Sequence, residues 1–112
     1  MKRLISANAS EILRMNAQEL KQSIKASEGR VILSENVAPR ESFIGDITNA
    51  EIARAFGADM ILLNCLDVLN PYIFGLKHDK DNFVDELHRL VGRPIAVSYT
   101  HLRAHETSQD LV

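Results

Sequence analysis

Polar side chains follow two short apolar runs of this sequence, and their types suit catalysis. Glu35 comes soon after the run 31–33, whereas Asn64 and Asp67 come after the run 60–63. A carboxylate such as Glu35 can act as a general base or bind a hard cation such as Mg²⁺, which prefers oxygen ligands. The amide of Asn64 can orient a substrate carboxylate or phosphate, and Asp67 would share a metal ion with Glu35 if both loops turn inward. We therefore predict Glu35, Asn64 and Asp67 as catalytic candidates.

Arg40 lies in the segment after Glu35 and is the nearest candidate to bind the anionic group of a substrate. Structural roles compete with all of these assignments. Asn64 would cap a loop, Asp67 would form an Asx-turn and Arg40 would be solvated. Glu35 would pair with a polar group at the end of a neighbouring strand. The residue types alone leave both interpretations open.

A unit consisting of an amphipathic helix, a glycine and an apolar run occurs three times, and it would position these side chains. The three copies span residues 20–34, 52–64 and 83–97. The glycines fall where a helix ends and φ > 0 is favoured, at Gly29, Gly57 and Gly92. The apolar runs are continuous rather than alternating, which is typical of parallel strands covered by helices. We predict strands near residues 30–34, 60–63 and 94–97, joined by crossover helices.

The helix starts have their own sequence signature. A polar residue with a glutamate three positions later indicates a capping box, and this pattern begins at Asn8, Asn16 and Thr48. For the helix of the third unit, Asp79 or Asp81 is the predicted N-cap. The predicted order is therefore a short extra helix followed by three helix–strand units.

Two α/β architectures fit this order, an open doubly wound sheet and a (β/α) barrel. A nucleotide-binding open sheet usually has a glycine-rich turn after its first strand, but no glycine occurs between residue 34 and Gly45. We therefore predict a parallel sheet of about three strands that forms the first part of a truncated (β/α) TIM-type barrel. A complete barrel needs roughly 250 residues, so the strand near residues 94–97 would leave an open edge.

Composition excludes several classes of partner. The chain has 112 residues, with 13 basic and 15 acidic side chains interspersed, so we expect no nucleic-acid partner. No apolar run is long enough to cross a bilayer, and we expect no membrane partner. The single cysteine, Cys65, rules out an internal disulfide and favours a cytoplasmic location. Because it lies in an apolar run, we predict Cys65 to be buried.

The C-terminal segment differs in character from the rest of the chain. Residues 98–107 continue no helical or strand period, and they resemble the translation of a DNA-sequencing adapter, as found at the ends of truncated metagenomic reading frames. We therefore divide the chain into a barrel part, residues 1–97, and a non-native tail, residues 98–112. His101 and His105 have the spacing of helical zinc ligands, but no general base lies between them, and we predict no metal site there.

Residues 1–97 resemble a bacterial family of TIM-barrel proteins of uncharacterised activity, sometimes labelled phosphoenolpyruvate phosphonomutase-like. The resemblance rests on residues 2–10, 24–30, 34–36, 49–64 and 92–95. It implies the N-terminal part of a barrel whose parent is an enzyme for a small anionic metabolite, with phosphoenolpyruvate-related chemistry and with Mg²⁺ as a candidate cofactor. On this interpretation the chain itself is inactive, because most strand ends are absent. The alternative is a genuine short α/β protein that self-associates through its open sheet edge.

Overall fold

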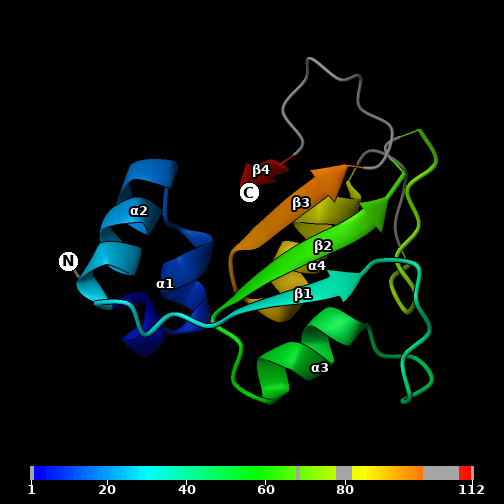
Figure 1. The fold of residues 1–112 in the computed structure, drawn as a ribbon, viewed down its shortest axis with the longest axis horizontal. Coiled ribbons are helices and arrows are strands. Elements are labelled where there is room, and N and C mark those ends of the chain that lie inside the picture. The colour runs from blue at the N-terminus through cyan, green and yellow to red at the C-terminus, as the bar shows by residue number, and fades with distance from the viewer. Residues whose placement is uncertain (1, 68, 78–81, 100–108, 112) are drawn as a thin grey trace.

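The computed structural model describes residues 2–67, 69–77, 82–99 and 109–111 and has an α/β architecture (Figure 1). A 3-10 turn, η1 (Leu4–Ser6), and two helices, α1 (Ala9–Leu13) and α2 (Ala17–Ala26), precede the alternating part. The remaining elements are β1 (Leu33–Val37), α3 (Asn49–Ala55), β2 (Met60–Leu66), α4 (Phe83–Val91), β3 (Ile95–Tyr99) and β4 (Gln109–Leu111). The sheet order is β1-β2-β3-β4, and β1, β2 and β3 are parallel. The predicted parallel sheet with crossover helices is confirmed. None of the described helices is long and apolar enough to cross a membrane.

The predicted helix starts are confirmed for three helices. In α1, α2 and α3 the side chain of the N-cap residue accepts a hydrogen bond from a glutamate backbone N–H, and the glutamate carboxylate accepts one from the N-cap backbone. These N-cap residues are Asn8, Asn16 and Thr48. For α4 the N-cap position is taken by Asn82, whose side chain makes no capping bond. The predicted caps Asp79 and Asp81 lie outside the described residues.

The first strand lies further along the chain than the apolar run predicts. It begins at Leu33 instead of residue 30. The reason is that the backbone N–H of Ile32, the residue before the strand, donates a hydrogen bond of 2.8 Å to the Asp59 carboxylate. The strand then continues to Val37, and its parallel ladder with β2 runs from Leu33 opposite Met60 to Val37 opposite Asn64. Glu35 and Asn64 therefore lie within strands and not in the loops that follow them, which corrects the prediction.

Helices α3 and α4 cover one face of the sheet, and the other face is more open. The covered face contributes Ile61, Leu63, Ile95 and Val97, all almost fully buried against Ala50, Leu87 and Val91. Side chains alternate along a strand, so the residues adjacent to these in sequence point toward the other face of the sheet. On that face Leu33 and Val37 are 51% and 38% exposed. We call it the open face; in a closed barrel it would be the interior.

A second cluster of buried side chains joins the N-terminal helices to the end of the sheet where the strands begin. It consists of Leu4, Ala7, Ile12, Leu20 and Met60. Arg93, only 5% exposed, holds this junction together. Its guanidinium donates to the backbone oxygens of Leu4, Ala7 and Asp59 at 3.1, 3.1 and 2.9 Å. Figure 1 shows α1 and α2 at this end, opposite the loops that follow the strands.

Two details of the sheet differ from the predictions. The third strand has no open edge, because β4 pairs with β3 in the antiparallel sense. The edge strands are therefore β1 and β4, each of which has one strand neighbour among the described residues. Cys65, predicted to be buried, is exposed and has a φ of 58°. The reason is an irregularity in the ladder between Leu63 and Leu66, which turns the intervening side chains away from the regular alternation.

Candidate functional site

Glu35 and Asn64 meet on the open face of the sheet. The Asn64 amide, from Nδ2, donates a hydrogen bond of 2.6 Å to Glu35 Oε2. The two residues come from adjacent parallel strands and lie diagonally across the ladder, because Glu35 is opposite Leu62 whereas Asn64 is opposite Val37. We call these two side chains the Glu35–Asn64 pair. The structure thus brings together two of the catalytic candidates that the sequence predicts.

The orientation of the Asn64 amide is fixed by a second hydrogen bond. Its Oδ1 accepts from the backbone N–H of Cys65 at 2.8 Å, so the amide nitrogen is directed toward Glu35. The Asn64 backbone oxygen accepts from Ala38 N at 2.9 Å, which ties β2 to the residue after β1. The strained backbone at Cys65 lies in the irregular part of β2, and such irregularities redirect side chains next to functional sites.

The pair combines a carboxylate with a preorganised amide donor. Glu35 is exposed, so its second oxygen is accessible to a ligand or to a proton. A carboxylate that accepts a hydrogen bond from a fixed amide keeps one orientation, which general base catalysis requires. The Asn64 amide retains a second N–H that can donate to an oxygen of a substrate. The arrangement can therefore remove a proton from a small molecule while holding one of its oxygen atoms.

Asp67 takes part in a local turn. Its Oδ1 accepts hydrogen bonds from the backbone N–H groups of Leu69 and Asn70, at 2.9 and 3.4 Å, which forms the Asx-turn of the competing interpretation. Within the described ranges, no three His, Cys, Asp or Glu side chains gather closely enough to hold a metal ion. Asp67 therefore shares no such cluster with Glu35. His101 and His105 lie outside the described residues.

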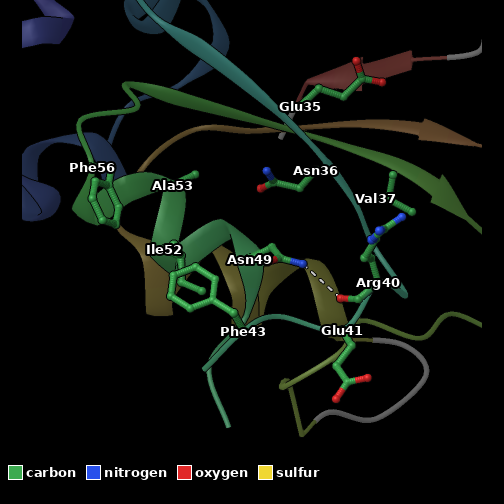
Figure 2. A pocket seen from close by; sticks show the side chains of 10 residues that line it. All are labelled: Glu35, Asn36, Val37, Arg40, Glu41, Phe43, Asn49, Ile52, Ala53 and Phe56. Carbon is green, nitrogen blue, oxygen red and sulfur yellow. Dashed lines mark hydrogen bonds between the residues drawn. The ribbon is translucent and has the colours of Figure 1, made fainter. Parts of the chain in front are cut away.

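Arg40 borders a hollow of about 560 Å³ at the open edge of β1 (Figure 2). Its wall includes Asn36 and Val37 from β1 and Asn49, Ile52 and Ala53 from α3. Figure 2 shows Glu35 pointing to the opposite side of β1 from Asn36 and Ile52. Arg40 is exposed, and its backbone oxygen accepts from Asn49 Nδ2 at 3.0 Å. The structure thus places Arg40 and the Glu35 carboxylate around the same strand edge, without a bond between them.

Much of this hollow is apolar. Phe43 and Phe56 line it and are 80% and 85% exposed. Asn36 Oδ1 is buried beside α3, with no hydrogen-bond partner among the described residues. Exposed aromatic side chains next to an unpaired strand are typical of a surface that another element covers. We therefore assign the hollow to the incomplete edge of the sheet, and the Glu35–Asn64 pair to the candidate active site.

Three residues have structural roles that the sequence patterns did not predict. Asn36 and Cys65 gave no sign of their burial and backbone strain, because these depend on where β1 and the ladder irregularity lie. The burial of Arg93 depends on the docking of the N-terminal residues Leu4 and Ala7, whose backbone oxygens accept from its guanidinium.

Comparison with known proteins identifies the family. A family model, described as a domain of unknown function (DUF7916), matches residues 5–111. The chain belongs to the DUF7916 family. The match includes the Glu35–Asn64 pair and continues beyond residue 97 into β4. Searches of curated proteins and of solved structures gave no match to this DUF7916 chain.

Proposed function

We propose that this DUF7916 chain carries one side of the active site of a (β/α)-barrel enzyme that acts on a small anionic metabolite. The supporting observation is the 2.6 Å bond between Glu35 and Asn64. Both side chains come from adjacent parallel strands and face away from the covering helices. Barrel enzymes take their catalytic groups from the carboxyl ends of neighbouring strands, on the interior side.

Each residue has a definite role in this proposal. Glu35 is the general base, and Asn64 holds its carboxylate and donates its second N–H to an oxygen of the substrate. Arg40 would attract the anionic group at the mouth of the site. Mg²⁺ fits this donor set only together with the substrate, because Mg²⁺ sites can consist of one or two carboxylates plus substrate phosphates and water. Phosphoenolpyruvate, a small phosphorylated carboxylate, is therefore the first substrate class to test.

The experiment is an NMR titration of the ¹⁵N-labelled chain with phosphoenolpyruvate, with and without Mg²⁺. The side-chain NH₂ resonances of Asn64 report on the pair directly. We expect them to move on addition of phosphoenolpyruvate, and to move less in E35Q, which removes the carboxylate charge. E28Q is the matched control, since Glu28 is exposed and lies before β1. An unmoved Asn64 resonance, or the same shift in E35Q as in the parent chain, would refute the proposal.

We also propose that residues 98–112 replace the native continuation of the barrel, so that this chain binds but does not turn over its substrate. The foreign character of residues 98–107 supports this proposal, whereas the family match to residue 111 and the pairing of β4 with β3 count against it. Long-read sequencing of the source DNA without ligated adapters tests it. A reading frame that continues past codon 97 into further β/α units is expected. A gene that encodes residues 98–112 and then stops would contradict it.

A second candidate function, self-association, is favoured by the open edge of β1. The edge strands of the described sheet are β1 and the short strand β4, and pairing of two copies through β1 would close at a dimer. The exposed Phe43 and Phe56 flank that edge. Sedimentation of the chain over a range of concentrations tests this function. We expect a dimer that F43S and F56S dissociate, with L69S as control because Leu69 is 69% exposed and does not line the hollow. A monomer at all concentrations would exclude it.

A further inference from the structure

A second cavity lies at the other end of the sheet, where the strands begin. Its volume is about 200 Å³. Its apolar wall comes from the N-terminal helices and the start of β3, and consists of Ile12, Met15, Ala17, Leu20 and Pro94. Two polar side chains, Asn16 and His88, complete the lining. The Glu35–Asn64 pair is in the part of the sheet toward the carboxyl ends of the strands, so this cavity is separate from it.

The cavity exists because the two apolar clusters do not merge. Ile12 and Leu20 belong to the N-terminal cluster, whereas Leu87 and Val91, which flank His88 on α4, belong to the main core. The contact of α1 with α4 occurs near the end of α4, where a Cβ on Gly92 would lie 2.6 Å from the Ala9 Cβ. That contact keeps the helices at a fixed separation, so the space beside His88 is not closed by a simple shift of α1.

Among the described residues, His88 is the imidazole that lines this cavity. It is half-buried; its backbone oxygen accepts a hydrogen bond from Gly92 N, but none of the described residues forms a hydrogen bond with its ring. Burial lowers the pKa of His88, although the carboxylate of Asp85 acts in the opposite direction. A neutral imidazole has one ring nitrogen that accepts a hydrogen bond. Asn16 is a weaker candidate than His88 to accept a hydrogen bond from a ligand, because its Oδ1 already accepts one from Glu19 N at 2.8 Å.

The size and the lining of the cavity indicate which class of ligand would fit it. An apolar cavity of roughly 150 Å³ is known to stay dry and to bind benzene, whereas a buried water needs two to four polar partners. We propose that this cavity binds a small uncharged molecule made of one apolar ring and one hydroxyl group, with the hydroxyl donating to His88. The competing roles are a histidine that only packs against α1 and a cavity that holds solvent.

Phenol is the probe for this site, and benzene is its partner without a hydroxyl. We expect phenol to shift the backbone amide resonances of Ile12, Leu20 and His88 in the ¹⁵N-labelled full chain. One hydrogen bond contributes about 0.5 to 1.5 kcal/mol, so phenol should bind about 2- to 10-fold more tightly than benzene. Shifts scattered over the surface, or no shifts at these residues, would overturn the proposal. Equal affinity for the two probes would show that the cavity does not use His88.

Three variants separate a binding site from general packing. Ala17 is exposed and lines the cavity, so the larger side chain of A17L would occupy part of the space. We expect A17L to abolish binding of both probes. Q18L is the control, because Gln18 is also exposed on α2 but does not line the cavity. H88F keeps a ring and removes the acceptor, so phenol should lose its advantage while benzene still binds. Equal loss of binding in A17L and Q18L, or an unchanged preference in H88F, would contradict the assignment.

Discussion

Gly92 and Ala9 are in such close contact that no side chain fits between them. A Cβ built on Gly92 would lie 2.6 Å from the Cβ of Ala9, and Gly92 has a φ of 69°. One glycine thus ends α4 in the left-handed conformation and also admits α1 against the end of α4. The C-terminus of a crossover helix and the docking of the N-terminal helices therefore depend on the same residue.

The Gly92→Ala variant tests this double role. We expect it to lower the free energy of unfolding by about 2 to 4 kcal/mol, because it adds a steric clash to the backbone strain. Urea denaturation followed by circular dichroism measures the change. G29A is the matched control: Gly29 has a similar φ of 78°, with nothing within 4 Å of an added Cβ, so only the strain applies. Equal destabilisation in the two variants would show that the Ala9 contact is unimportant.

Arg93 should be the most sensitive charged residue of the chain. R93M removes the guanidinium donor from the backbone oxygens of Leu4, Ala7 and Asp59. The Leu4 oxygen still accepts from Ala7 N, and an unsatisfied buried acceptor costs about 1 to 3 kcal/mol. We expect a loss of about 3 kcal/mol and faster hydrogen exchange in α1. R93K should not restore stability, since one ammonium lacks the planar fork of donors. R89M, at an exposed position of α4, serves as control, and a loss there as large as in R93M would refute the assigned role.

His88 should make stability depend on pH below neutrality. Its pKa is lowered in the folded chain, mainly by burial, so the unfolded chain binds more protons as the pH falls below the ordinary value of 6.5. The contribution of His88 to stability is therefore complete above pH 6.5 and declines as the pH falls toward the lowered pKa. We expect H88Q to reduce the difference in urea midpoint between pH 7.5 and 5.5. An identical pH dependence in H88Q and the parent chain would disprove this linkage.

Thr48 should contribute more than an ordinary N-cap. It is fully buried, and its Oγ1 accepts a hydrogen bond from Glu51 N at 3.1 Å and is within hydrogen-bond distance of Glu51 Oε1, at 2.9 Å. T48A removes the cap of α3, and we expect it to lower the free energy of unfolding by about 1 to 2 kcal/mol. T48S keeps the hydroxyl and should recover most of this loss. If T48S is as unstable as T48A, the missing methyl group and not the cap is responsible.

Local patterns predicted the elements of this chain well. The capping residues Asn8, Asn16 and Thr48 start helices as expected, because a cap and its glutamate interact within a single turn. The glycines predicted to end the helices of the three units, Gly29, Gly57 and Gly92, have positive φ angles. The parallel order of β1, β2 and β3 follows from the continuous apolar runs and the crossover helices.

The sequence by itself determined the helix starts, the α/β alternation and the proximity of Glu35 to the carboxyl end of the first strand. Tertiary structure decided the rest, because it depends on contacts between residues that are distant in the chain. Asp59 sets where β1 begins, the ladder irregularity exposes Cys65, and β4 takes the place of β3 as an edge strand of the sheet. The Glu35–Asn64 bond joins residues 29 positions apart, and only the register between β1 and β2 places them on the same face.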